Sequence, residues 1–511
     1  MRELRKVNLG PLVFDPRPSR VWFFVAASAC LLIAGCAVGP NYKRPSAPEV
    51  AGYTEHPITS TVTATNAAGG EAQHFNTSSD IAGDWWTLFH SPPLNELIEL
   101  SLTNNPDLKA AQAALLVARE NTQAQRGGYY PSVTTSFSAS RHQDPRAALA
   151  AVPSDNSYLY NLFTPQVSVS YTPDVFGLNR RTVESLKAQE QGVRFQMIAT
   201  YTTLTANLVV TAIQAASVQT QIDATRQLIG INSNMVQILQ YQFTKGYASR
   251  LDVVAQESQL AQVIATLPPL IKQSAQLRDQ LAVLAGCFPN QLPAEHFDLL
   301  DLQLPVDLPV SLPAQLVAQR PDVLQAEANL HSASAQVGVA IANRLPNITL
   351  SADAGSTALS INKVFTSGTG FWALGAAASA PIFEGGTLLH QERAAKAAYV
   401  QAAEQYRSTV LTACQNVADT LVALEQDAEG LKASATAADD AQITLDLSQR
   451  QWKDGYISYL ALLSAEQAYQ QTRINLVQAQ ANRFADTAAL FQALGGGWWH
   501  RGDLTKDKHE K

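Results

Sequence analysis

Residues 106–140, PDLKAAQAALLVARENTQAQRGGYYPSVTTSFSAS, join two kinds of secondary structure at a single proline. The stretch opens with Pro106-Asp107, and the Ala, Gln and Leu residues that follow as far as Tyr130 are typical of a helix. From Val133 to Ser140, apolar residues alternate with small polar ones, which indicates a strand with one polar face. Pro131 lies at the change, where its ring and missing N–H end a helix. The stretch therefore predicts a helix followed by an amphipathic strand.

The same arrangement returns about 215 residues later. Pro321-Asp322-Val323 opens a second helical segment, which ends at Leu345-Pro346 and is followed by alternation from Ile348 to Ala354. Because the Pro-Asp start, the closing proline and the alternation recur in one order, we predict an internal duplication with repeats over 84–305 and 306–499.

Each repeat contains a second strand that returns toward the first. Gln166–Thr172 alternates in the first repeat, and a strand is predicted around Phe371–Leu374 in the second. The sequence therefore predicts two β-hairpins, at about 133–173 and about 347–381. One face of these strands carries polar residues: Thr134, Ser136, Ser138, Thr349, Ser351 and Asp353.

Long helices follow both hairpins. They are predicted from Leu178 to about Gln219 and from Leu388 to about Leu424, because few glycines and no prolines interrupt these segments. We expect the chain to turn back near 219–223 and 419–431. Further interruptions are predicted at two similar sequences, which contain Gly246-Tyr247 and Gly455-Tyr456.

The first residues have the layout of an export signal. A basic segment precedes an apolar run from Val21 to Ala34, and Ile33-Ala34-Gly35-Cys36 resembles the lipobox of bacterial lipoproteins. We predict a signal peptide over 1–35 and acylation of Cys36, with Ala37 indicating transfer to the outer membrane. A plain signal peptide is the alternative. Residues 36–83 are predicted to be a lipidated tether, and 500–511 a disordered tail.

Composition argues against several classes of function. The chain has 511 residues, a formal net charge of −7 and 15% charged residues, so no basic surface for nucleic acid is expected. The nine histidines are scattered, and neither a nucleophile motif, a phosphate-binding loop nor a metal-binding pattern occurs. We therefore predict no enzymatic activity, no cofactor and no metal. Cys287 and Cys414 are predicted to be small buried residues without a disulfide.

Four alternating strands are too few to close a barrel in a membrane, which needs at least eight. Open strand edges in hydrocarbon would leave backbone N–H and C=O groups without partners. A barrel must therefore be shared among subunits. Two subunits would supply eight strands and a filled interior, and three would supply twelve strands and room for a lumen.

Several motifs together resemble the outer-membrane factor (TolC-like) family, in its NodT-like lipoprotein branch. The resemblance covers nearly all of the mature chain, and it rests on Cys36-Ala37-Val38-Gly39-Pro40-Asn41-Tyr42-Lys43-Arg44-Pro45, the Trp85-Trp86 helix, Arg320-Pro321-Asp322-Val323, Pro381-Ile382-Phe383-Glu384-Gly385-Gly386 and the paired Gly-Tyr turns. It implies an α+β membrane protein, trimeric, with a shared 12-stranded β-barrel continued by a long coiled-coil α-barrel and two repeats per chain.

The resemblance also implies a function. The chain would be an outer-membrane channel that extends into the periplasm and serves as the exit duct of a tripartite efflux or export system. Its partners would be two further copies of itself, a periplasmic adaptor protein, an inner-membrane pump and, through Cys36, outer-membrane lipid. A mixed equatorial belt would lie at the turns containing Gly246, Tyr247, Gly455 and Tyr456.

A periplasmic gate is predicted where the second long helix turns back. Threefold symmetry would make rings of acidic or leucine side chains there. The candidates are Asp419, Leu421, Leu424, Glu425, Asp427 and Glu429. For the acidic residues the alternative is a solvated helix surface.

One competing function remains from a different class. The chain could be a non-conducting structural or adhesive lipoprotein with a coiled-coil body. The two predicted hairpins favour the channel, because an adhesive coiled coil has no need of membrane-height strands.

Overall fold

We describe a computed structural model of the chain, which covers residues 37–50, 52–77, 79–143, 145, 159–292 and 297–505. The chain divides into two compact units. The strand unit contains residues up to 41, 124–184 and 334–396, and the helical unit contains the intervening segments and the C-terminal part.

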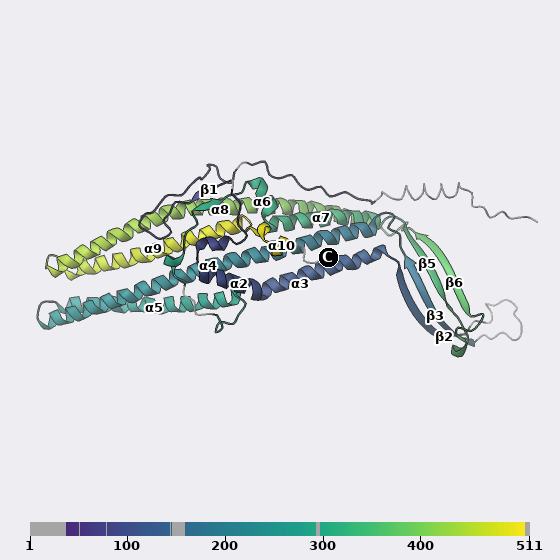
Figure 1. Cartoon of the computed structure of the whole chain (residues 1–511), viewed down its shortest axis with the longest axis horizontal. Coiled ribbons are helices and arrows are strands. Elements are labelled where there is room, and N and C mark those ends of the chain that lie inside the picture. The colour runs from purple at the N-terminus through teal and green to yellow at the C-terminus, as the bar shows by residue number, and fades with distance from the viewer. Residues whose placement is uncertain are drawn as a thin grey trace, which may run out of the picture. The chain divides into compact units, whose positions relative to one another are not determined.

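The two repeats have the same order of elements (Figure 1). The first repeat consists of α2 (Pro92–Asn104), α3 (Pro106–Arg126), β2 (Ser132–Gln143), β3 (Leu159–Tyr171), α4 (Leu178–Thr244) and α5 (Arg250–Leu284). The second consists of α6 (Pro313–Gln319), α7 (Pro321–Ala342), β5 (Asn347–Ser356), β6 (Gly370–Ser379), α8 (Thr387–Lys453) and α9 (Tyr459–Ala493). Helices α4 and α8 both have 67 residues, and α5 and α9 both have 35, as a duplication requires.

The strand unit contains one antiparallel sheet in the order β2-β3-β5-β6 (Figure 1). The two hairpins are therefore neighbours, joined through β3 and β5, with Ser168 opposite Asp353. The hairpins span 132–171 and 347–379, and period-2 alternation marks their strands because it is a local signal that the sheet preserves.

The helical unit has a large apolar core that includes aromatic residues from distant segments. Trp85 and Phe89, in the 3-10 helix Trp85–Phe89, pack beside Phe484 and Phe491 of α9, and the rings of Trp85 and Phe491 stack at 5.0 Å. Each such buried side chain contributes roughly 1.5–3 kcal/mol. The Trp85-Trp86 segment thus anchors the start of the first repeat on α9, at the end of the second.

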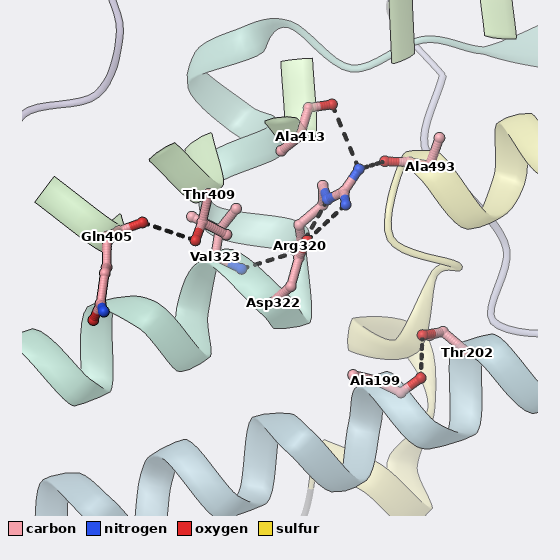
Figure 2. Close-up of polar contacts among 9 residues, drawn as sticks. All are labelled: Ala199, Thr202, Arg320, Asp322, Val323, Gln405, Thr409, Ala413 and Ala493. Atoms are coloured by element: carbon pink, nitrogen blue, oxygen red, sulfur yellow. Dashed lines mark hydrogen bonds and ion pairs between the residues drawn. The ribbon is translucent and has the colours of Figure 1, made fainter. Parts of the chain in front are cut away.

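Arg320 joins three helices of the helical unit (Figure 2). Its guanidinium donates two hydrogen bonds to the Asp322 carboxylate, from Nε at 3.0 Å and from Nη2 at 2.6 Å. Nη1 donates to the carbonyl of Ala493, the last residue of α9, at 3.0 Å and to that of Ala413 in α8 at 3.5 Å. A cation here satisfies a carbonyl at the C-terminus of α9, where the helix dipole favours positive charge. The Arg-Pro-Asp sequence therefore ties the start of α7 to α8 and α9.

The predicted ends of the long helices were wrong. Helices α4 and α8 continue without a break through 219–223 and 419–431, and the chain turns back at 245–249 and 454–458. No proline lies at the predicted ends, and a single glycine inside a helix, such as Gly230 or Gly430, costs only about 1 kcal/mol. After each long helix the chain turns back at Gly246 or Gly455, which both have a left-handed φ of 79°.

The prediction of a free tether over 36–83 was wrong for most of the described residues. Strand β1 (His74–Asn76) pairs in parallel with β4 (Asp307–Pro309), and Tyr53 donates a hydrogen bond to the carbonyl of Ser311 at 2.7 Å. A small region that mixes short strands with short helices lies at 74–76 and 299–319. Gly246 and Gly455 lie instead in the turns that follow two long helices, so the mixed belt predicted at these residues was misplaced.

The prediction of a disordered tail over 500–511 was wrong for the described residues 500–505. Gly502–Thr505 form the short helix α10, and Leu504 is buried. Residues 506–511 lie outside the described part of the chain. Cys287 and Cys414 are free thiols, as predicted, although both are only half-buried.

Candidate functional site

The register of the four strands separates their side chains into two faces. Val133 lies opposite Val169, Val169 opposite Ala352, and Ala352 opposite Leu374, which makes one row across the sheet. The next row consists of Thr134, Ser168, Asp353 and Ala373. Because side chains alternate along a strand, adjacent rows point to opposite faces. All six predicted polar residues, Thr134, Ser136, Ser138, Thr349, Ser351 and Asp353, share the face of the second row.

The face of the first row is apolar and exposed. Trp372 is 76% exposed and Leu374 is 75% exposed. Val133, Phe137, Val167 and Leu350 on the other strands are exposed as well. A contiguous apolar surface of this kind marks contact with a membrane or a partner. The strands have 12, 13, 10 and 10 residues, and about 9–11 residues suffice to cross the hydrocarbon of a bilayer.

The opposite face carries a polar network. Gln166 Nε2 donates to Asp353 Oδ1 at 2.9 Å and to Ser168 Oγ at 2.7 Å. Thr164 and Thr357 share a hydrogen bond of 2.6 Å between their hydroxyls. Such a face is suited to contact with water, so one face of the sheet is suited to lipid and the other to an aqueous phase.

Strands β2 and β6 are the edges of this sheet within the described chain. Each edge has a row of backbone N–H and C=O groups that the sheet itself does not pair. In hydrocarbon, every such group needs a partner. A membrane-inserted sheet of this kind therefore requires a neighbouring chain at each edge.

The two helical hairpins, α4–α5 and α8–α9, end in turns with the same hydrogen-bond pattern. Gly246 N donates to Phe243 O and Tyr247 N to Gln242 O, and Gly455 N donates to Trp452 O and Tyr456 N to Gln451 O. Tyr247 is 84% exposed and Tyr456 is 81% exposed. Ser249 caps α5 and Ser458 caps α9, so each new helix starts within a few residues. The predicted turn residues therefore lie at the ends of the two hairpins.

Near these turns, one apolar cluster joins the two helical hairpins. It contains residues of α4, α5, α8 and α9: Met235, Leu239, Val253, Leu445, Tyr459, Leu462 and Ala465. Polar contacts continue it, because Gln256 Nε2 donates to Asn232 Oδ1 at 2.8 Å and Gln467 Nε2 to Gln259 Oε1 at 2.8 Å. The ends of the hairpins are thus packed together.

Glu466 is a buried carboxyl in this region. It is 6% exposed, and neither carboxyl oxygen has a hydrogen-bond partner among the described residues. The Tyr459 hydroxyl and Gln256 Oε1 are likewise buried without a partner there. Because burial disfavours the charged form, it raises the pKa of the Glu466 carboxyl to about 7. Glu466 is therefore largely neutral in mildly acidic solution.

The six predicted gate residues do not gather at a turn. All lie within α8, where Leu421 and Leu424 are buried in the large core, and Asp419 and Glu429 are exposed on the helix surface. Glu425 is half-buried. The reasoning that placed a gate here required a helix reversal that does not occur.

Among the gate candidates, Asp427 meets other charged groups of the described chain. Burial and a hydrogen bond with the Asp486 carboxyl raise its pKa to about 7, although the nearby Arg483 opposes this. Arg483 is fully buried, and its Nη2 donates to Thr61 Oγ1 at 3.0 Å and to Glu71 O at 2.5 Å. Burial lowers the pKa of this guanidinium. These groups fix the segment 61–73 against α9.

Sequence reasoning missed Glu466 and Arg483. Both are charged residues of α9, a type usually found at exposed positions of a helix, and residues far away in the chain bury them. No local signal identifies either. Cys36, the predicted acylation site, lies outside the described residues. No described helix combines the length and the apolar character that are needed to cross a membrane.

Comparison with known proteins agrees with this architecture. A family model described as outer membrane efflux protein matches residues 97–287 and 312–496, more than half of the chain. The chain is 29% identical over 485 residues to the toluene efflux pump outer membrane protein TtgF of Pseudomonas putida, covering 93% of this chain and 97% of TtgF.

Two further similarities extend over the same length. The chain is 27% identical over 479 residues to nodulation protein T of Rhizobium leguminosarum bv. trifolii, covering 92% of this chain and 96% of that protein. Among solved structures it is similar to the outer-membrane channel OprN, with a TM-score of 0.79 and 26% identity, covering 91% of this chain and 100% of that one.

Proposed function

Because the chain belongs to the outer membrane efflux protein family, we propose that it is the exit duct of a tripartite efflux or export system. It is a channel protein of the outer membrane rather than an enzyme. The observation that carries the proposal is the four-stranded sheet, with one exposed apolar face, one polar face and two open edges.

The open edges support a homotrimer. Three copies of a four-stranded sheet supply twelve strands, and edge β6 of one copy can pair with edge β2 of the next until the barrel closes. Closure satisfies every edge group in the hydrocarbon. With the polar rows inside, a barrel of this size has room for water and a small solute.

Helices α4 and α8 are the longest helices of the described chain. Each starts a few residues after a strand of the sheet, and 67 helical residues span roughly 100 Å. We propose that the hairpin turns at 245–249 and 454–458 form the periplasmic end, where an adaptor protein and an inner-membrane pump connect. A gate of the duct then belongs at these turns rather than at 419–429.

The N-terminal residue of the mature chain is proposed to be an acylated Cys36. Several acyl chains, each burying CH₂ groups worth about 0.8 kcal/mol apiece, would hold the chain in the outer membrane together with the barrel. The adhesive alternative gains no support, because a coiled-coil adhesin has no use for an exposed apolar sheet.

Planar-bilayer recording of the purified full-length protein tests the proposal. We expect discrete conductance steps from a species that chemical cross-linking shows to be trimeric. Protein that inserts into bilayers and cross-links as a trimer but gives no steps, even after the turns at 245–249 and 454–458 are cut by protease, would contradict a duct.

A further inference from the structure

The residues that follow Cys36 are fixed to the strand unit by one arginine. Arg181, in the first turn of α4, is buried, and its guanidinium reaches three successive parts of the N-terminal segment. Nε donates to Val38 O at 3.0 Å, and Nη2 donates to Gly39 O at 3.3 Å and to Asn41 Oδ1 at 2.8 Å. Val38 N in turn donates to Phe176 O at 3.1 Å.

The arginine is itself held in place. Nη1 donates to Glu184 Oε2, one helical turn further along α4, at 2.7 Å. The stem of the side chain crosses α7 at Gly338, where an added Cβ would lie 2.8 Å from Arg181 Cγ. A buried guanidinium with this many directed bonds is a rigid clamp, since its planar fork loses little freedom on binding.

The N-terminal segment fits the surface closely where the clamp holds it. A Cβ on Gly39 would lie 2.4 Å from the Cα of Gly338, and Gly39 has a φ of 94°, which disfavours any other residue. A Cβ on Gly177 would meet Ala37 at 2.7 Å. Ala37 therefore lies against the turn that joins β3 to α4.

Contacts continue along the next residues, within the helical unit. The ring of Tyr42 stacks on His331 of α7 at 4.3 Å, and its hydroxyl donates to Glu327 Oε1 at 3.4 Å. Arg44 donates to Glu327 Oε2 from Nε at 3.1 Å and forms an ion pair at 2.9 Å. The sequence from Ala37 to Arg44 is thus a docking sequence, with a specific contact at most of its residues.

We propose that Arg181 is the positioning residue for the lipid-bearing N-terminus, holding Ala37–Asn41 at the end of β3 so that acyl chains enter the membrane at one fixed place. The inference rests on the proposed acylation of Cys36, which precedes Ala37 by one peptide bond. A flexible tether over 37–83 would instead let the lipid range over roughly 40 Å. The clamp instead keeps Ala37 beside the turn between β3 and α4.

Trypsin provides the test, because Lys43 lies within the docked segment. Full-length protein carrying a clickable fatty acid is digested briefly, and cleavage after Lys43 is followed by the release of label and by the appearance of a new N-terminus at Arg44. We expect Arg181→Ala to speed this cleavage at least about tenfold, which corresponds to about 1.4 kcal/mol of lost docking. Arg180→Ala, on the exposed side of the same turn, is the matched control and should cleave like the wild type.

Cleavage after the exposed Lys245, at the hairpin turn, is the internal control for general loosening and should stay unchanged. Gly39→Ala is a second variant that acts from the segment itself and leaves α4 and α7 intact; it should also speed cleavage at Lys43. Equal rates at Lys43 in wild type, Arg181→Ala and Gly39→Ala would overturn the proposal, as would a parallel rise at Lys245. Absence of label from the wild type refutes the acylation alone, because the new N-terminus at Arg44 still reports whether Arg181 holds the segment.

Discussion

Two neighbouring residues of β6 offer a direct test of which face of the sheet meets lipid. Leu374 belongs to the apolar row with Val133, Val169 and Ala352, whereas Ala373 lies opposite Asp353 on the polar face. Leu374→Lys and Ala373→Lys therefore add the same charge to the same strand, one residue apart, on opposite faces.

The two variants should differ widely in membrane stability. Leu374 is the fifth of the ten residues of β6, so it lies near the middle of the hydrocarbon. A lysine on the lipid face of a barrel costs about 2–4 kcal/mol at the midplane. In a trimer the cost arises three times, once per chain. Ala373→Lys instead faces water and the Asp353 carboxylate, and a cross-strand pair of opposite charges contributes roughly 0.2–1 kcal/mol.

Folding into lipid vesicles, followed by urea titration, measures the difference. We expect Leu374→Lys to lower the free energy of unfolding by about 2–4 kcal/mol per chain and to reduce the inserted fraction, while Ala373→Lys inserts like the wild type. Conductance of the Ala373→Lys channel should show reduced cation preference, because the new charge lines the lumen. If both variants insert equally well, or if Ala373→Lys is the one that fails, the assignment of the faces is refuted.

Three further outcomes follow from individual contacts. Because the pKa of Glu466 is raised to about 7, the folded chain keeps a proton between the ordinary pKa and about 7 that the unfolded chain releases, so stability falls as pH rises through this window. Urea titrations at pH 5 and pH 8 should show a fall of up to about 3 kcal/mol in the free energy of unfolding, and Glu466→Gln should remove most of it. An unchanged fall in the variant would contradict the burial of Glu466. Arg320→Lys cannot reproduce the two hydrogen bonds to Asp322 and should lower the free energy of unfolding by about 2–4 kcal/mol in thermal or urea unfolding. Arg407→Lys, on the exposed surface of α8, is the control, and equal losses of stability in both variants would show that the carbonyls of Ala413 and Ala493 do not need Arg320. Replacing Tyr247 and Tyr456 together by Ala should raise resting conductance in planar bilayers, whereas Asp419→Ala should not, and the reverse result would return the gate to the middle of α8.

The sequence predicts the features that depend on local pattern. Alternation from Val133 to Ser140 and from Ile348 to Ala354 is visible without any tertiary information, and the prolines at 131 and 346 mark where the helices stop. The polar face followed from the same alternation, and the observed register confirms that its six residues lie together. The pairing of β3 with β5 was not predicted, because it joins segments about 180–190 residues apart.

The misplaced gate illustrates a limit of reading charge density along a helix. A turn was expected near 419–431, and the acidic residues there suggested a gate, but helix α8 continues through this segment, and exposed carboxylates on a long helix are simply solvated. The chain reverses where a glycine can adopt a positive φ, and the Gly-Tyr pairs were the better indicator. The three-residue strands β1 and β4 escaped prediction for the opposite reason, because each is too short to show alternation.

The helical hairpins α4–α5 and α8–α9 differ in the environment of one equivalent glutamate. Counted from the capping serines Ser249 and Ser458, Glu257 and Glu466 occupy the same position, eight residues into their helices. Glu257 accepts a hydrogen bond from Gln240 at 3.1 Å near the surface, but Glu466 is buried beside the cluster that joins the hairpins and has no such partner among the described residues. The equivalent carboxylates therefore differ in environment, because one lies at the surface and the other is buried. The buried proton of Glu466 makes the packing of the second hairpin depend on pH, through a position whose counterpart in the first hairpin keeps its surface hydrogen bond.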